Sequence, residues 1–295
     1  MEPTRAILVT GANRGIGKAI VEAILEQTSD TLVYLGSRDR KRGETAVMDI
    51  QARKSHWKDR AVMLPLDVGS DASVDSAAKI VRQNINPDLT FYGIVNNAGV
   101  GYPDSDLKQT LDINVRGIKR VVEAFAPLMP SEGGRIVNLT SAAGPNFVAK
   151  CSSEYQYRLT SDATSLESLE NLMAEAEGMP SRQALEKAGL GDGSAYGFSK
   201  ACANTLTLIQ ARMLPQHLVN ACTPGFIETE LTRPIAAARG MTPEEMGMKS
   251  VEHGTVAPLK LLCDLIKSSG WYYGSDGLRS PLHEYRAPGA PEHSP

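Results

Sequence analysis

The chain has 295 residues, enough for one large α/β domain or two small ones. It carries 31 basic and 34 acidic residues, a net charge of −3, which argues against a protein that binds nucleic acid through a strongly basic surface. The apolar fraction of 42% and the charged fraction of 22% are those of an ordinary globular chain.

Short apolar runs alternate with longer amphipathic stretches along the chain. The predicted strands cover residues 6–9, 31–35, 61–66, 91–95, 135–139, 218–222 and 270–273. The predicted helices cover residues 16–24, 40–51, 74–85, 106–128 and 195–213. The strands are nearly continuous hydrophobic runs, as expected when helices cover both faces of a parallel sheet. The alternation therefore predicts a single doubly wound, Rossmann-like α/β domain over residues 1–279, with a seven-stranded, mainly parallel sheet.

Two segments depart from this alternation. Residues 145–193 are polar, rich in Ser and Glu, and longer than an ordinary strand-to-helix connection. They are predicted to form a functional or packing insert, with short helices at 164–176 and 181–188. Residues 280–295 are rich in Pro, Gly and Glu, which predicts a tail that lies on the surface or is partly disordered.

Cysteine and histidine spacing predicts no metal site. The four cysteines form no C-x-x-C pair and the five histidines form no H-x-x-x-H pair, and this cysteine usage favours a reducing compartment. No segment approaches the ~18 consecutive apolar residues of a membrane helix. Residues 1–5 lead directly into an apolar strand rather than into a signal core. We therefore expect a cytoplasmic protein without membrane or nucleic-acid partners.

A glycine-rich turn follows the first predicted strand, in Thr10-Gly11-Ala12-Asn13-Arg14-Gly15-Ile16-Gly17. Gly11 would allow the turn out of the strand, Gly15 the close approach of a pyrophosphate, and Gly17 the packing of the helix on the sheet. The free N–H groups and the positive dipole end of the helix would then face the phosphates. A tight turn without a ligand is the alternative, but the flanking strand and helix favour a dinucleotide site.

The end of the second strand predicts the type of dinucleotide. A fold that prefers NAD usually places an acid there to bond the ribose 2′-hydroxyl, but this chain has Ser37 followed by Arg38. Arg14 adds a second guanidinium near the same ribose, and two such groups suit the 2′-phosphate of NADP(H). In the alternative, Arg38 is only a solvated strand end and Asp39 caps the next helix.

The sequence Tyr196-Gly197-Phe198-Ser199-Lys200 places a phenol and an ammonium group on one face of a predicted helix. A nearby ammonium favours the phenolate, so we expect Lys200 to lower the pKa of Tyr196 and to make it a proton donor near neutral pH. Polar or small residues also follow two other strands, Asp67 after the third and Asn96 to Gly99 after the fourth. Each of these could alone be ordinary turn chemistry.

A series of short motifs follows along the chain, namely TGANRGIG, Leu66-Asp67-Val68, NNAG, Asp112-Ile113-Asn114-Val115, Asn138-Leu139-Thr140-Ser141, Tyr196 with Lys200, and the run from Thr223 to Thr229. Together, in this order, they resemble the short-chain dehydrogenase/reductase family. The resemblance covers roughly residues 5 to 275. The insert and Arg38 resemble the monomeric NADPH-dependent carbonyl reductases in particular. Thr140 stands where many relatives have a second Ser, and the chain beyond Gly274 has no clear counterpart.

The resemblance implies a catalytic tetrad. Tyr196 would be the acid in reduction, Ser141 would bond the substrate carbonyl oxygen, Lys200 would hold the nicotinamide ribose, and Asn114 would position a water in the proton relay. The implied cofactor-binding residues are Gly11, Asn13, Arg14, Gly15, Ile16, Gly17, Arg38, Asp67, Val68, Asn97, Ala98, Gly99, Tyr196, Lys200, Pro224, Gly225, Ile227 and Thr229.

These residues predict NADPH-dependent reduction of a small ketone or aldehyde to an alcohol by a monomeric enzyme. An NADP-linked alcohol or steroid dehydrogenase that works in oxidation is one alternative, because the same residues serve both directions. A dinucleotide-binding sensor without turnover is another, although such proteins usually lack the Tyr or the Lys. The insert and residues 230–250 are expected to line or cover the substrate side.

Overall fold

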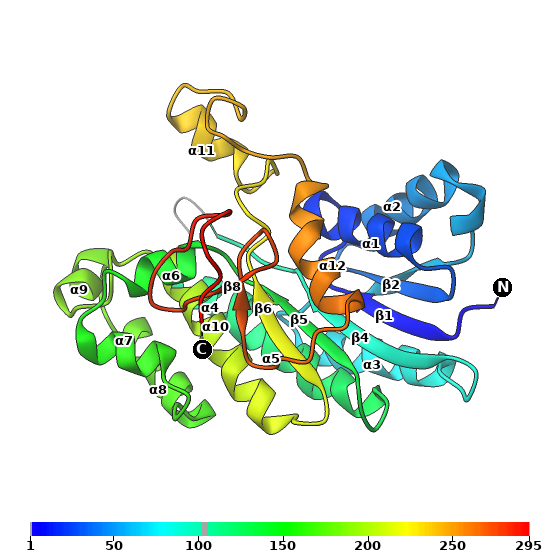
Figure 1. Cartoon of the computed structure of the whole chain (residues 1–295), viewed down its shortest axis with the longest axis horizontal. Coiled ribbons are helices and arrows are strands. Elements are labelled where there is room, and N and C mark those ends of the chain that lie inside the picture. The colour runs from blue at the N-terminus through cyan, green and yellow to red at the C-terminus, as the bar shows by residue number, and fades with distance from the viewer. Residues whose placement is uncertain (1, 102–105, 295) are drawn as a thin grey trace.

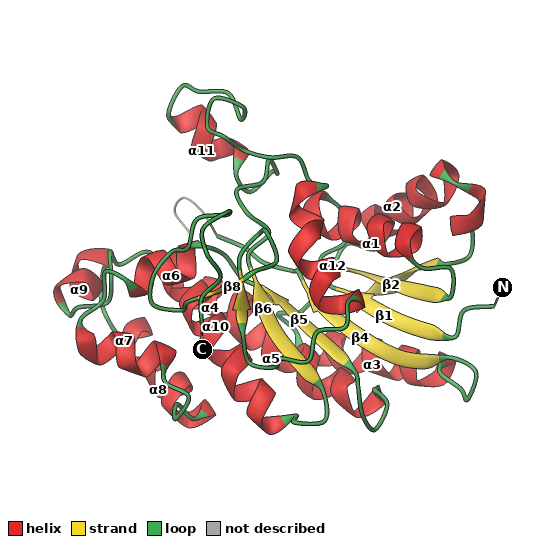
Figure 2. Cartoon of the chain, viewed as in Figure 1, coloured by secondary structure: helices red, strands yellow, loops and turns green. Residues whose placement is uncertain are grey.

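The computed structural model describes residues 2–101 and 106–294, and a sheet of eight strands runs through the centre of this part of the chain (Figures 1 and 2). The strand order is β3-β2-β1-β4-β5-β6-β7-β8, and all neighbouring pairs are parallel except β7 with β8. The strands are β1 Arg5–Val9, β2 Thr31–Ser37, β3 Ala61–Pro65, β4 Thr90–Asn96, β5 Arg135–Leu139, β6 Leu218–Cys222, β7 Tyr272–Tyr273 and β8 Arg279–Ser280. The predicted doubly wound fold is confirmed.

The sheet has one strand more than the seven that were predicted. β8 has two residues and pairs antiparallel with β7, Tyr272 opposite Ser280 and Tyr273 opposite Arg279. A two-residue strand is too short for any hydrophobic pattern to reveal it, since alternation needs at least four residues.

Helices cover both faces of the sheet (Figure 2). The helices α1, α2 and α12 pack on one face, and α3, α5 and α10 pack on the other, each layer with its own apolar core. The bounds are α1 Gly15–Gln27, α2 Arg40–Arg53, α3 Asp71–Asn84, α4 Leu107–Leu111, α5 Gly117–Phe125, α6 Ala143–Val148, α7 Ser153–Thr160, α8 Leu166–Glu177, α9 Arg182–Lys187, α10 Ala195–Met213, α11 Arg233–Ala238 and α12 Val256–Cys263, with short 3₁₀ turns at Ser55–Trp57, Ala126–Leu128 and His253–Thr255. No helix of these described residues is long and apolar enough to cross a membrane.

The helix predicted over residues 106–128 is interrupted. A π-helical turn, Asp112–Arg116, joins α4 to α5, and we call it the π-turn. At its end the N–H of Gly117 donates to the carbonyl oxygen of Asp112, five residues earlier. Hydrophobic spacing cannot reveal such a turn, because the apolar residues continue on the same face. Turns of this kind occur often at functional sites.

The insert folds as four short helices beside α10, at the left of Figure 1. The helices α8 and α9 correspond to the two that were predicted, whereas α6 and α7 were not predicted. Leu159, Leu169, Leu172 and Met173 are buried in the core that α10 shares. The hydroxyl of Thr205 in α10 donates to the carbonyl oxygen of Leu159 at 2.6 Å. The insert therefore covers one side of α10.

The C-terminal segment folds back beside β7 and is held there by the polar contacts of one side chain. Arg286 is only 9% exposed and forms an ion pair with Asp276. Its Nε donates to Ser280 Oγ at 2.9 Å and its Nη1 to the carbonyl oxygen of Ala290 at 2.6 Å. One buried guanidinium thus holds together a segment that has little apolar surface. His283, Glu284 and Tyr285 are exposed, as expected for a segment on the surface.

Candidate active site

A cavity of about 630 Å³ lies at the carboxyl ends of the strands. It opens where the strand order reverses between β1 and β4, the position at which open α/β sheets bind ligands. Sixteen of the predicted site residues line it, namely Gly11, Asn13, Arg14, Gly15, Ile16, Gly17, Arg38, Asp67, Val68, Asn97, Ala98, Gly99, Tyr196, Lys200, Pro224 and Thr229. Four others, Ser141, Asn114, Gly225 and Ile227, lie outside the lining.

The glycine turn has the backbone shape that its sequence predicted. Gly11 and Gly15 have positive φ angles of 63° and 54°, a region that favours glycine. A Cβ on Gly17 would lie 2.4 Å from Asn97 Nδ2 and 2.7 Å from the carbonyl oxygen of Gly11, so only glycine fits where α1 begins. The N-cap residue of α1, Arg14, makes no side-chain capping bond, which leaves the first N–H groups of the helix to the cavity.

Hydrogen bonds fasten the end of β4 to the glycine turn. Thr10 Oγ1 accepts from the N–H groups of Asn97 and Ala98, both at 3.0 Å. Asn97 Nδ2 donates to the carbonyl oxygens of Thr10 at 2.9 Å and Gly11 at 3.1 Å. The side chain of Asn97, one of the residues expected to bind the cofactor, therefore holds together the two strand ends that flank the cavity.

The basic end of the cavity differs in detail from the prediction. Arg38 is exposed and lines the cavity. Ser37 is buried, and its hydroxyl donates to the carbonyl oxygen of Asp39 at 2.8 Å. Asp39 caps α2 by accepting from the N–H of Arg42. Arg14 forms an ion pair with Glu230, a cavity residue that the sequence analysis did not single out.

Tyr196 and Lys200 lie one turn apart on α10, whose N-terminus is capped by Ser194. Lys200 Nζ lies 5.6 Å from the centroid of the Tyr196 ring and donates to the carbonyl oxygen of Leu139 at 3.1 Å. Burial lowers the pKa of Lys200 to about 8. Ser194 and Leu139 thus fix the pair at the inner end of the cavity.

The pKa of Tyr196 is not lowered, contrary to the expectation from the nearby Lys200. Burial raises the pKa of Tyr196 above its ordinary value, and a side-chain hydrogen bond with Ser141 opposes this rise. Burial removes the phenolate from water, and this desolvation is the larger of the two effects. Tyr196 therefore keeps its proton at neutral pH.

Ser141 follows β5 and lies beside Tyr196, with which it shares a side-chain hydrogen bond. Its Oγ also accepts from the N–H of Ala143 at 3.1 Å, in the turn that leads into α6. The neighbouring Thr140 lines the cavity. The hydroxyl of Ser141 is thus held next to the phenol.

Asn114 occupies the middle of the π-turn and is fully buried. Its Oδ1 accepts from the N–H of Val100 at 2.9 Å, and its Nδ2 donates to the carbonyl oxygen of Val100 at 2.8 Å and to Ser199 Oγ at 3.0 Å. The amide therefore ties the π-turn to the segment after β4 and to α10. The water that the resemblance implied would have to use the backbone of the π-turn, because the side chain is engaged.

Gly225 and Ile227, which were predicted to contact the cofactor, shape the segment after β6 from behind the cavity. Gly225 has a φ of 94°, which turns the chain after Pro224. Ile227 is 2% exposed, and a Cβ on Gly254 would lie 3.2 Å from its Cγ1. The segment after β6 also places Glu228, Glu230 and Leu231 in the lining. Glu228 lies within the run from Thr223 to Thr229 that carries the family resemblance, and Glu230 and Leu231 begin the segment that was expected on the substrate side.

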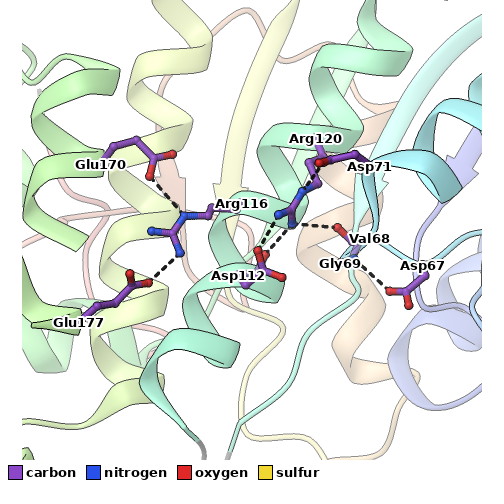
Figure 3. A network of polar contacts seen from close by, with 9 residues as sticks. All are labelled: Asp67, Val68, Gly69, Asp71, Asp112, Arg116, Arg120, Glu170 and Glu177. Atoms are coloured by element: carbon purple, nitrogen blue, oxygen red, sulfur yellow. Dashed lines mark hydrogen bonds and ion pairs between the residues drawn. The ribbon is translucent and has the colours of Figure 1, made fainter. Parts of the chain in front are cut away.

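A network of ion pairs surrounds the π-turn (Figure 3). Arg116 pairs with Glu170 at 3.3 Å and Glu177 at 2.7 Å, both on α8 of the insert. Arg120 points the other way, toward Asp71 at 2.7 Å and Asp112 at 2.6 Å. Neither arginine belongs to a recognisable motif, and Glu170, Glu177 and Asp71 are 49 to 61 residues away in the chain.

The doubly wound sheet, with its glycine turn and cavity at the switch point, defines a dinucleotide-binding α/β protein. A family model, described as short chain dehydrogenase, matches residues 5–156, and the chain belongs to this family.

Two curated relatives are similar over most of their length. Carbonyl reductase [NADPH] 3 of Rattus norvegicus is 30% identical over 275 residues, 88% of this chain and 90% of the relative. Carbonyl reductase [NADPH] 1 of Bos taurus is 31% identical over 271 residues, 86% of this chain and 89% of the relative. Among solved structures, salutaridine reductase from Papaver somniferum superposes with a TM-score of 0.76 at 24% identity, covering 91% of this chain and 99% of that one.

Proposed function

We propose that the protein is an NADP-dependent oxidoreductase that reduces the carbonyl group of a small ketone or aldehyde to an alcohol, with Tyr196 as the proton donor. The names of the two mammalian relatives support the cofactor and the reaction class. The observation that carries the proposal is that Tyr196, bonded to Ser141 and stacked near Lys200, lines the same cavity as the glycine turn.

The residues of the cavity fit a dinucleotide. The uncapped start of α1 and the close approach that Gly15 and Gly17 allow suit a pyrophosphate. Arg38, and Arg14 once it leaves Glu230, would hold the 2′-phosphate that distinguishes NADP from NAD. Asp67 would accept from the adenine amino group, and Lys200 would hold the nicotinamide ribose. When bound, NADPH would supply the hydride.

The chain's own residues account for the proton. A buried phenol with a raised pKa is protonated at neutral pH, which is the state needed to donate to the developing alkoxide. The Ser141 hydroxyl, already bonded to Tyr196, would hold the substrate oxygen beside that phenol. Lys200, with a pKa of about 8, stays largely cationic at pH 7 and would stabilise the phenolate left after donation.

The proposal is tested with purified protein, NADPH and a generic diketone or quinone, by following NADPH oxidation. We expect Tyr196→Phe to bind NADPH as the wild type does and to lose about 10²- to 10⁴-fold in kcat, the usual contribution of a general acid. Lys200→Ala should lose both affinity and rate. A Tyr196→Phe variant with near-wild-type kcat contradicts the proton donor, and NADPH binding without turnover of any carbonyl favours a sensor.

A further inference from the structure

Arg120 in α5 joins two segments that meet at the cavity (Figure 3). Its Nε donates to Asp71 Oδ1 at 2.7 Å and its Nη2 to Asp112 Oδ1 at 2.6 Å. Its Nη1 donates to the carbonyl oxygens of Val68 at 3.3 Å and Asp112 at 3.2 Å. The side chain is only 20% exposed, so these bonds are partly shielded from water. All three nitrogens of one guanidinium are therefore shared between the loop after β3 and the π-turn.

The segment after β3, from Asp67 to the first residue of α3, Asp71, forms one wall of the cavity, and we call it the β3 loop. Asp67 and Val68 line the cavity directly, and Asp67 Oδ1 accepts from the N–H of Gly69 at 3.0 Å. A Cβ on Gly69 would lie 2.7 Å from Ile113 Cδ1, and one on Gly117 would lie 3.1 Å from Val68 Cγ2. The β3 loop thus packs directly against the π-turn and the start of α5.

The π-turn also holds a second wall. Through Asn114 it bonds both the N–H and the carbonyl oxygen of Val100, which lines the cavity after β4. One wall is therefore fastened to the π-turn by Asn114 and the other by Arg120. Removing Arg120 leaves the Val68 side of the cavity without this charged tie.

We propose that Arg120 is a positioning residue that clamps the β3 loop to the π-turn and so sets the shape of the cavity at the adenine end of the dinucleotide. The inference rests on the proposed function and deepens it. The clamp needs a planar fork that can bond several oxygens at once, and a lysine ammonium cannot span the same set of acceptors. Arg120 touches none of the reacting atoms and acts through Val68, Asp71 and Asp112.

The experiment compares Arg120→Met with Arg116→Met. Arg116 lies one turn earlier, is 23% exposed, and also loses two ion pairs when replaced, but these run to α8 of the insert. The dissociation constants of NADPH and of adenosine 2′,5′-bisphosphate, its adenine half, are measured by fluorescence and calorimetry. We expect Arg120→Met to raise both constants by about ten-fold, because part of the binding free energy is then used to order the released β3 loop, with kcat at saturating NADPH nearly unchanged. Arg116→Met should leave both constants within about two-fold of the wild type.

A merely structural role would lower the stability of both variants alike and leave the affinity for the adenine half unchanged. Equal dissociation constants in the two variants, or an unaffected adenosine fragment, overturn the clamp. If Arg120→Met does not fold, Arg120→Lys, which keeps the charge, is measured in its place. It should still raise the dissociation constants of NADPH and of adenosine 2′,5′-bisphosphate by about three-fold or more. Full wild-type affinity in Arg120→Lys also overturns the clamp. Failure of the wild type itself to bind NADPH contradicts the proposed function and takes this inference with it.

Discussion

At the scale of single residues, cofactor choice is expected to depend on Arg38. The hydroxyl of Ser37 is turned onto the carbonyl oxygen of Asp39, and Arg14 is engaged by Glu230. Arg38 is left as the exposed cation at the end of β2 that lines the cavity. It is therefore a sharper probe of the 2′-phosphate than Ser37, whose replacement by an acid would bury a charge.

We expect Arg38→Gln to lower the ratio of kcat/KM for NADPH to that for NADH by about 10- to 100-fold. A charge-assisted hydrogen bond is worth roughly 1.5–3 kcal/mol, and about 1.4 kcal/mol corresponds to a factor of ten. Arg40→Gln is the matched control, because Arg40 is the first residue of α2 and its side chain is 78% exposed. It should leave the ratio of kcat/KM for the two cofactors unchanged. An unaltered ratio in Arg38→Gln would show that another group binds the phosphate.

Lys200 predicts a specific pH dependence of stability. Its pKa is lowered by burial from 10.5 to about 8, so between these values the unfolded chain binds more protons than the folded one. The free energy of unfolding contributed by this group therefore rises with pH from about 8 to 10.5. A shift of this size corresponds to about 3 kcal/mol.

Urea unfolding of the cofactor-free wild type and Lys200→Met at pH 7 and pH 10.5 measures this contribution. We expect the difference in unfolding free energy to change by about 3 kcal/mol in favour of the wild type at the higher pH. The comparison cancels the titration of the buried tyrosines away from this site, Tyr34, Tyr155, Tyr272 and Tyr273, which both proteins share. A pH-independent difference would mean that Lys200 titrates normally in the folded protein.

At the scale of elements, the turn from β1 into α1 has no room for a side chain. We expect Gly17→Ala to lower the free energy of unfolding by about 1–3 kcal/mol, because two of the nearest atoms, Gly11 O at 2.7 Å and Ala12 Cα at 2.8 Å, are backbone. The affinity for NADPH should fall as well. Gly178→Ala, at the end of α8, places its Cβ no closer than 3.5 Å and is the control. Equal stability in the two variants would argue against tight packing at Gly17.

Elements whose signals are local were predictable from the sequence. The bounds of β5, β6 and α10 agree with those predicted, since each is a long apolar run or a periodic segment with clear ends. The glycine turn and the pair Tyr196 and Lys200 follow from spacing within one element. Ser141 and Asn114, by contrast, came only from the family resemblance.

Elements that depend on distant contacts were not predictable. The π-turn keeps the hydrophobic face of an ordinary helix, so nothing in the periodicity marks it. Arg14 pairs with Glu230, although one follows β1 and the other follows β6. Arg120 contacts Asp71 and Val68 only in the folded chain, because both are about 50 residues earlier in the sequence. The pKa of Tyr196 was misjudged because the degree of burial of a phenol cannot be read from its spacing to a lysine.

At the scale of the whole molecule, we propose a monomer. The insert packs α7 and α8 over α10, and Arg116 ties α8 to the π-turn through Glu170 and Glu177. An apolar helix face covered from within the chain leaves less surface for a partner. Light scattering at micromolar concentration should return 31.7 kDa. A stable mass of twice or four times this value would contradict the proposal.

The short strand β8 has a consequence for the edge of the sheet. The backbone groups of Tyr272 and Tyr273 would otherwise face outward as a template on which the strand of another molecule could pair. The buried Arg286 keeps the chain folded back beside them through Ser280 and Asp276. With only two residues, β8 closes the outer edge of β7 and itself offers little template for pairing with another molecule.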